Sequence, residues 1–409
     1  MTQEATAIEE RSLLSPEVVA DPYSYFDELR TKDPVHWSGI HHSWLLTAYP
    51  DVDLALRSPR LSADRVAAMM RRRGQSLSDG AAPVYQILSR WMVFNDPPGH
   101  RRLRSVFDNA FTPRAMRSLS PRIVEVIDHL IDAVAPAGQM DVVHDFAYPL
   151  PAIVIAELIG VPASDRDIFK SWSDDVALLV FGALTMSDRH QVAQRSLVSL
   201  AAYMRDLVHQ YQKQPGDNVV SRVLASGAIG TTVSEDELVG MLTHVLFAGH
   251  ETTTNLIASG LRALLRNPEQ LELLRANPQL MATAVDELLR YDGPAKLVVR
   301  AAAEDFELRG RSIRAGDRVF AVQAGANRDP DYFADPTRLD IRRSPNPHLG
   351  FGIGPHFCLG AGVARTEAQL ALAALINRLP QLQLVPIKHR WHESLINRSL
   401  VELPVRFKS

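Results

Sequence analysis

One decapeptide carries the only cysteine of this 409-residue chain: Phe351-Gly352-Ile353-Gly354-Pro355-His356-Phe357-Cys358-Leu359-Gly360. Cys358 stands just before a predicted amphipathic helix, Gly360–Leu379, where backbone N–H groups stabilise an anion and favour a thiolate. The nearby glycines let the backbone approach a flat partner closely. The residues alone leave two alternatives open. In the first alternative, Cys358 is a buried thiol that acts as a small hydrophobe. In the second, it is a catalytic nucleophile with His356 as its base.

Length and composition are those of an ordinary globular protein. Apolar residues make up 46% and charged residues 22%, which excludes disorder, collagen and coiled coil as descriptions of the whole chain. The formal net charge of −3 gives no basic excess for nucleic acid. One cysteine excludes an internal disulfide and a zinc site built on several thiolates, and it favours the cytoplasm.

No targeting or membrane segment is predicted. The first residues, MTQEATAIEERSLLSPEVV, lack the basic start and apolar core of a signal peptide. No run approaches the ~18 consecutive apolar residues of a membrane span, and the longest candidate, Val176–Met186, is too short. Because no repeat or Gly/Ser linker divides the chain, we expect one domain over residues 1–409. We also expect a monomer with no membrane or nucleic-acid partner.

Helical periodicity dominates after a small predicted hairpin, Val35–Ser38 and Ser43–Tyr49. Helices are predicted over Pro98–Asn109, Arg122–Ala133, Pro162–Leu179, Arg189–Lys213, Pro268–Ala276, Pro278–Tyr291 and Gly360–Leu379. Strands are predicted over Leu297–Ala301, Phe306–Leu308 and Arg318–Val322. The predicted fold class is therefore mainly α with small β-sheets (α+β).

The longest predicted helix begins with a capping box, Ser234 and Glu237, and ends at Asn267-Pro268. At roughly 32 residues it is about 48 Å long. The radius of gyration expected for the whole chain is only about 22 Å, so this helix must cross the centre. Its middle holds poor helix formers, Gly249 and three successive threonines. They indicate either a local opening of the helix, or a kink or close helix crossing at Gly249.

Several motifs occur in one characteristic order. They are Asp96-Pro97-Pro98-Gly99-His100 with Arg104; Ala248-Gly249-His250-Glu251-Thr252-Thr253; Glu287-Leu288-Leu289-Arg290; Asn327-Arg328-Asp329-Pro330 followed by Phe333, Asp335, Pro336 and Asp340; and the Cys358 decapeptide. Together they extend from about residue 96 to 365, and the chain resembles the cytochrome P450 monooxygenases. The resemblance implies the cytochrome P450 fold, with haem b as cofactor and a long central helix that crosses it.

The resemblance assigns the chemistry to a few side chains. Cys358 would be the thiolate ligand of the haem iron, which increases the electron density on the metal and favours O–O cleavage. Glu251 and Thr252 would be the catalytic pair, since in the family this acid and alcohol relay protons to dioxygen. His250 has no assigned role.

Glu287, Arg290 and Arg343 would form a buried ion-pair network that supports the cysteine loop. Loss of one member of such a network costs several kcal/mol. Without the other motifs, Glu287 and Arg290 would be a routine surface pair at i, i+3.

Haem propionates need cationic or donor partners. His100 and Arg104 lie at i, i+4 on one helix face, and with Arg300 and His356 they match family positions that bind propionates. Each of them taken alone is equally a solvated cation. The expected haem contacts also include Ala248, Gly249, Phe351, Cys358 and Gly360.

The expected substrate is a mainly hydrophobic small organic molecule. Its expected lining residues, which core packing explains equally well, are Met92, Val93, Val180, Leu246, Phe247, Lys296, Val298 and Ile396. Lys296 shares a predicted strand face with Val298 and Arg300. Its ammonium group either meets a substrate anion or extends to solvent.

The chain has no flavin or iron–sulfur segment, so the resemblance implies a ferredoxin and a ferredoxin reductase, with NAD(P)H acting only through them. Arg101, Arg102 and Arg365 are part of a docking face for that ferredoxin or are solvated helix charges. The expected function is an O2-dependent monooxygenase, most simply a hydroxylase in secondary metabolism. The alternatives are a non-catalytic haem sensor or carrier and a peroxide-driven peroxygenase, and Glu251 with Thr252 favours the monooxygenase.

Overall fold

The computed structural model describes residues 8–66, 82–108, 111–165, 168, 171–172, 175–177, 180 and 187–408. The helices are α1 (Pro16–Ala20), α2 (Tyr23–Lys32), α3 (Tyr49–Arg57), α5 (Ala82–Ser89), α6 (Gly99–Asp108), α7 (Pro113–Val134), α8 (Pro149–Ile159), α10 (Ser187–Lys213), α11 (Val219–Ala225), α12 (Glu235–Arg266), α13 (Pro268–Ala276), α14 (Met281–Asp292), α15 (Gln323–Ala326) and α16 (Ala361–Arg378). The strands are β1 (Val35–Ser38), β2 (Ser43–Leu46), β3 (Leu61–Ser62), β4 (Gln139–Asp141), β5 (Val298–Ala302), β6 (Phe306–Leu308), β7 (Arg311–Ile313), β8 (Arg318–Ala321), β9 (Gln383–Leu384) and β10 (Pro404–Arg406).

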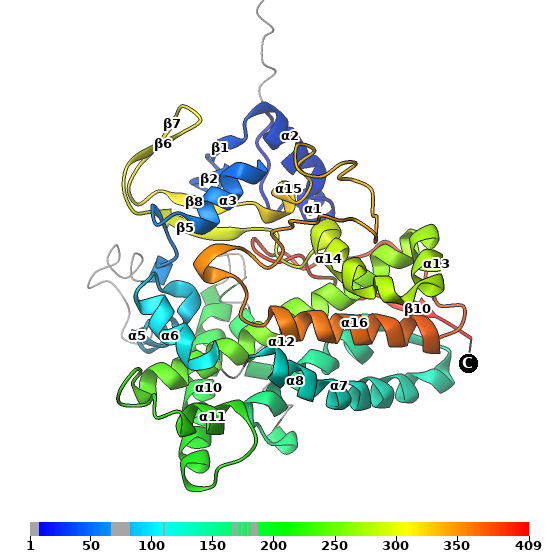
Figure 1. The fold of residues 1–409 in the computed structure, drawn as a ribbon. Coiled ribbons are helices and arrows are strands. Elements are labelled where there is room, and N and C mark those ends of the chain that lie inside the picture. Colours follow the sequence, from blue (N-terminus) through cyan, green and yellow to red (C-terminus); the bar gives the residue numbers. More distant parts are fainter. Residues whose placement is uncertain are drawn as a thin grey trace, which may run out of the picture.

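The strands form three small sheets, in the orders β1-β2-β8-β5-β3, β4-β10-β9 and β6-β7. Strands β2 and β8 are parallel, although they come from opposite ends of the chain. The largest sheet lies on one side of the molecule, while the longer helices occupy the other (Figure 1). The expected fold class, mainly α with small sheets, is confirmed.

The long helix α12 occupies the centre, as predicted. It contacts α8, α10, α14 and α16, which surround it (Figure 1). The predicted capping box is present, because Ser234 Oγ accepts the N–H of Glu237 at 3.1 Å and Glu237 Oε2 accepts the N–H of Ser234 at 2.9 Å. Local signals at both ends therefore predicted this helix correctly.

Several predicted boundaries are wrong. The strand predicted over Ser43–Tyr49 ends at Leu46, because Pro50 lies in the first turn of α3. The helix predicted over Pro278–Tyr291 is a 3₁₀ turn, Pro278–Leu280, followed by α14. The helix predicted over Pro162–Leu179 lies largely outside the described residues.

Short strands were missed altogether. Strands β3, β4, β7, β9 and β10 have two or three residues each, too few to show alternation. Three of them pair with partners far away in the sequence, such as β10 with β4. Tertiary contacts rather than local propensity therefore define them.

One described segment, Val142–Ile159, is long and apolar enough to cross a membrane, with a mean hydropathy of 1.5. It ends in α8, which packs against α12, and 61% of it is buried inside the protein. This burial is that of a core segment, so the segment is weak evidence for a membrane span.

Candidate active site

The middle of α12 reaches the surface at one place only. From Leu238 to Leu261 every residue is buried except exposed Ala248 and half-buried Gly249, Glu251 and Thr252. Because α12 crosses the centre of the protein, the accessible side chains in its middle line an interior space. The sequence motif and the accessible stretch of the helix therefore coincide.

Close packing between two helices explains why glycine stands at position 249. A Cβ atom at this position would lie 2.6 Å from Cγ1 of Ile155 on α8, so the two helices cross too closely for any other residue. Helix α12 continues without interruption through this stretch. The local opening that we predicted is therefore not found, and the alternative of a close helix crossing is confirmed.

The cysteine loop is held by its own backbone. The N–H of Cys358 donates to the carbonyl of Phe351 at 2.9 Å, and the N–H of Phe357 donates to Gly354 at 3.1 Å. Gly352 and Gly354 have φ values of 67° and 74°, which only glycine adopts without strain. The loop thus presents a half-buried Cys358 shortly before α16.

Burial raises the pKa of the Cys358 thiol, although the N–H of Gly360 and the charges of Arg104 and Arg365 act to lower it. The backbone N–H at the helix start thus acts in the predicted direction, while desolvation of the thiol opposes it. Burial also lowers the pKa of His356 to about 3, which makes it a poor base. This environment disfavours the nucleophile alternative. Metal binding would remove the thiol proton.

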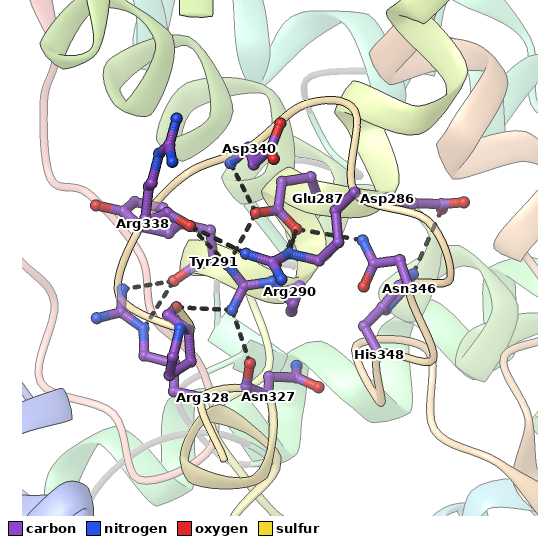
Figure 2. Close-up of polar contacts among 12 residues, drawn as sticks. Asp286, Glu287, Arg290, Tyr291, Asn327, Arg328, Arg338, Asp340, Asn346 and His348 are labelled. Carbon is purple, nitrogen blue, oxygen red and sulfur yellow. Dashed lines mark hydrogen bonds and ion pairs between the residues drawn. The ribbon is translucent and has the colours of Figure 1, made fainter. Parts of the chain in front are cut away.

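Glu287 and Arg290 form a buried, two-bonded ion pair (Figure 2). Arg290 Nε donates to Glu287 Oε2 at 2.7 Å, and Arg290 Nη2 donates to Oε1 at 2.8 Å. Arg343 Nε adds a bond to Oε2 at 3.0 Å, so the predicted network of three residues is present. The N–H of Asp340 and the side-chain amide of Asn346 also donate to this carboxylate, at 2.9 and 3.3 Å.

The same network reaches the cysteine loop. Arg290 Nη1 donates to the carbonyl of Asn327 at 2.9 Å (Figure 2). Asn327 Oδ1 in turn accepts the N–H of Leu349 at 2.7 Å, two residues before Phe351. A second connection runs from Asp286 on α14 to Arg365 on α16 at 2.8 Å. The loop is therefore attached to α14 from both sides.

The tetrapeptide Glu-Leu-Leu-Arg occurs a second time, at residues 272–275 of α13. Glu272 and Arg275 also form an i, i+3 ion pair, at 2.6 Å, but the side chain of Glu272 is 66% exposed. At Glu287 and Arg290 the side chains are completely buried. Position in the fold, not the motif itself, separates the two pairs.

The four predicted propionate ligands lie together. The rings of His100 and His356 are 4.1 Å apart between centroids, and His356 lies within the electrostatic reach of Arg300 and Arg104. Arg300 is buried, and burial lowers its pKa to about 10. Arg104 differs from expectation, because its guanidinium donates to the carbonyl of Phe357 at 2.6 Å and so also supports the cysteine loop.

Arg65 joins this group, although no sequence motif indicated it. Its pKa is lowered to about 10 by burial and by the charge of Arg300, so the two cations are neighbours. The guanidinium lies 4.8 Å from the ring centroid of Phe94. No described residue accepts a hydrogen bond from it. Neither guanidinium makes an ion pair with a described carboxylate, so these two neighbouring cations fit an anionic group of a ligand.

The predicted substrate-pocket residues fall into two groups. Five of them belong to or pack against one hydrophobic cluster: Met92, Val93, Val180, Leu246 and Phe247. Leu359, next to Cys358, packs against the same cluster. The other three lie elsewhere, since Val298 and Ile396 pack against clusters on the sheet side and Lys296 pairs through its backbone with Ile396.

Lys296 does not extend to solvent. The residue is buried, and its ammonium donates to the carbonyl of Ser394. Burial and the charge of Arg398 lower its pKa to about 7. The solvent-exposed alternative is therefore wrong, and a contact between Lys296 and a substrate anion stays a prediction.

Two of the three arginines suggested for ferredoxin docking form internal ion pairs. Arg102 bonds to Glu237 at 2.6 Å and Arg365 to Asp286 at 2.8 Å. Arg101 is exposed and makes no ion pair with a described residue. The docking role of this face stays a prediction.

Glu367 on α16 is a buried carboxyl that no motif indicated. It is 1% exposed, its Oε2 atom has no hydrogen-bond partner among the described residues, and burial raises its pKa to about 8. A folded-state pKa above the unfolded value of 4.5 destabilises the fold as soon as the pH exceeds 4.5, and the penalty grows until pH 8. At pH 7 the penalty is about 3 kcal/mol.

We therefore expect Glu367→Gln to stabilise the protein at pH 7 by up to about 3 kcal/mol and to change little at pH 4.5. The measurement is urea unfolding of both haem-loaded proteins from pH 4.5 to 8. Glu393→Gln, at an exposed position, is the control and should show no such pH dependence. A constant difference between variant and wild type at every pH would contradict the assignment.

The residues of this site fit a haem group. A half-buried thiol can bind its iron, the neighbouring cations Arg65 and Arg300 suit its carboxylates, and the accessible stretch of α12 leaves room for a ligand. A thiolate ligand combined with an acid–alcohol pair, Glu251 and Thr252, defines the class of haem-thiolate monooxygenases.

Comparison with known proteins agrees with this class. The model of the family "Cytochrome P450" matches residues 184–392. Biotin biosynthesis cytochrome P450 of Bacillus subtilis (strain 168) is 37% identical over 97% of this chain and 99% of its own length. Cytochrome P450 monooxygenase PikC of Streptomyces venezuelae is 38% identical over 97% and 93%.

Solved structures give the same result. The crystal structure of P450BioI in complex with acyl carrier protein ligated to hexadec-9Z-enoic acid superposes with a TM-score of 0.89 and 36% identity, covering 96% of this chain and 99% of that one. The chain belongs to the cytochrome P450 family. It is a haem-thiolate monooxygenase, and its family implies haem with a cysteine thiolate ligand and O2 as co-substrate.

Proposed function

We propose that this chain hydroxylates a mainly apolar small molecule in secondary metabolism, with electrons supplied from NAD(P)H through a ferredoxin reductase and a ferredoxin. The bound haem would activate dioxygen and supply one oxygen atom to the substrate. The observation that carries the proposal is the accessible acid–alcohol pair, Glu251 and Thr252, in the otherwise buried middle of α12. We further propose a cytoplasmic, monomeric enzyme of one domain.

The two side chains of the pair have different tasks. Thr252 Oγ1 donates to the carbonyl of Ala248 at 3.3 Å, a long and therefore weak bond, so the hydroxyl can turn toward a reacting oxygen. Glu251 is half-buried and lies next to it, which suits a carboxyl that passes protons from the solvent side. His100, Arg104, Arg300, His356 and Arg65 would hold the haem carboxylates.

An apolar substrate agrees with the cluster around Phe247 and Leu359. P450BioI was solved with a long fatty acyl chain carried by acyl carrier protein, and a long apolar chain of that kind suits this lining. Substrate binding would exclude water from the space next to Thr252, so that protons are delivered by the side chains of Glu251 and Thr252 rather than by bulk water.

We expect Thr252→Ala to separate electron consumption from product formation. Without the hydroxyl, protons are no longer delivered at the reacting oxygen, so NADPH is still consumed while product falls about 100-fold or more and hydrogen peroxide appears. The measurement compares NADPH oxidised, peroxide released and product formed, with ferredoxin, reductase and a substrate found by spectral titration. Glu251→Gln should slow NADPH consumption as well.

The matched control is Thr254→Ala. Thr254 lies on the same helix and is buried, and its hydroxyl has no partner among the described residues. It should leave the ratio of product to NADPH unchanged. Full coupling in Thr252→Ala would contradict the proton-relay role, and absence of turnover in the wild type across a broad compound library would contradict the proposed function itself.

A further inference from the structure

His244 is a buried polar side chain that the proton relay does not use. It lies on α12 at i, i+7 from Glu251, two turns along the same face. It is 8% exposed, its Nδ1 atom is enclosed without a partner, and neither ring nitrogen is hydrogen-bonded to a described residue. Buried polar atoms almost always have partners, and since the described part of the chain gives this imidazole none, a ligand can supply one.

The imidazole of His244 packs on an aromatic group centred on Trp91. Trp91 stacks on His244 at 5.0 Å between ring centroids, and Trp91 also stacks on Phe247 at 5.4 Å and on Phe94 at 5.9 Å. The indole N–H of Trp91 donates to Thr243 Oγ1 at 2.9 Å, so this donor is already used. Among the described residues of this aromatic group, His244 is the polar side chain that is left without a hydrogen-bond partner.

The aromatic group around Trp91 lies between the predicted haem-binding residues and the predicted apolar pocket. His244 lies close enough to His100 and His356 for the charges of these imidazoles to influence one another. Trp91, on which His244 stacks, belongs to the hydrophobic cluster against which Val93 and Val180, two predicted substrate-lining residues, pack. A molecule bound between these two regions meets His244.

The charge state of His244 restricts the kind of ligand group that its ring can bind. Burial lowers its pKa to about 3, so the ring is neutral at physiological pH. A neutral imidazole offers one donor and one acceptor, which matches a hydroxyl or a carbonyl group. A carboxylate would instead need a cation, and the cations of this site, Arg65 and Arg300, lie with the propionate-binding residues.

We propose that His244 contacts the substrate and selects it, by a hydrogen bond from its ring to a hydroxyl or carbonyl oxygen of an otherwise apolar molecule. This inference rests on the proposed function, because it places the substrate next to the haem, and it adds the kind of polar group that the substrate carries. Rings of the substrate would pack on Trp91 and Phe247.

The experiment measures binding rather than turnover. The haem-loaded wild type, His244→Phe, His244→Gln and His250→Phe are titrated with indane, 1-indanol and 1-indanone, and dissociation constants are read from the absorption shift and from calorimetry. In the wild type the two oxygenated probes should bind at least about tenfold more tightly than indane. His244→Phe should reduce this preference about tenfold, and His244→Gln should retain part of it.

His250→Phe is the matched control on the same helix. His250 is equally buried, but its Nδ1 contacts the carbonyl of Leu246 at 3.3 Å and its ring packs on Tyr148 outside the cluster, so the preference should stay. Equal weakening of all three probes by His244→Phe would make His244 a packing residue and overturn the inference. So would an unchanged preference, or a wild type without one.

Two further results distinguish failure of the inference about His244 from failure of the proposed function. If His244→Phe and His244→Gln lose haem while His250→Phe keeps it, His244 holds the cofactor instead and the inference is wrong. If the wild type prefers the oxygenated probes but shows no turnover with any compound, the proposed function fails while His244 still binds a neutral oxygen. The ratio of dissociation constants and the assay of turnover therefore report independently.

Discussion

Replacement of Glu287 by alanine is expected to lower the free energy of unfolding by about 3–5 kcal/mol. The change leaves buried Arg290 and half-buried Arg343 without their shared carboxylate, and the N–H of Asp340 loses its acceptor (Figure 2). Since the same network fixes the backbone before the cysteine loop, the variant should also lose most of its haem. Urea unfolding and haem content per chain are the measurements.

The chain itself provides the control for this prediction. Glu272→Ala removes a carboxylate from the same tetrapeptide, with the same i, i+3 spacing, on an exposed surface. It should cost less than about 1 kcal/mol and leave the haem content unchanged. If both variants lost similar stability, burial would not be the cause and the network would not support the loop.

These two tetrapeptides also show where sequence reasoning stops. The motif at residues 287–290 was recognised only because other motifs accompanied it, and the identical tetrapeptide at residues 272–275 forms an exposed surface pair. Burial decides between them, and burial depends on contacts with Asn327, Arg338 and Asp340, which lie far along the chain. Local signals, in contrast, were sufficient for α12, whose capping box and Asn-Pro stop lie within a few residues of its ends.

The polar groups that were missed have a common physical cause. Arg65, His244 and Glu367 belong to no motif, and what distinguishes each of them is a buried or half-buried polar atom with no hydrogen-bond partner among the residues that the structure describes. A sequence gives the type of each residue, but tertiary contacts decide whether its polar atoms find hydrogen-bond partners. The same holds for Lys296, which was expected to face substrate or solvent and instead bonds to the carbonyl of Ser394.

Replacement of Cys358 by alanine is expected to abolish monooxygenase activity. In the proposed site the Cys358 thiolate would be the ligand that increases electron density on the iron, and no other described residue of the loop Phe351–Gly360 offers a sulfur. Reduced protein treated with carbon monoxide should show the strongly red-shifted absorption of a haem-thiolate in the wild type and lack it in the variant. Because Cys358 is only half-buried, circular dichroism should show that the fold is kept.

Loss of haem alone would also abolish activity, so a second variant separates the two causes. Cys358→His offers the iron a nitrogen ligand and should keep haem while it still loses the red-shifted absorption and the activity. Haem-free wild type adds an independent test of the thiol. Because burial raises the pKa of Cys358, iodoacetamide should alkylate it slowly at pH 7, whereas a catalytic nucleophile would react fast. A Cys358→Ala variant that kept both colour and activity would contradict the thiolate site on which the catalytic assignment depends.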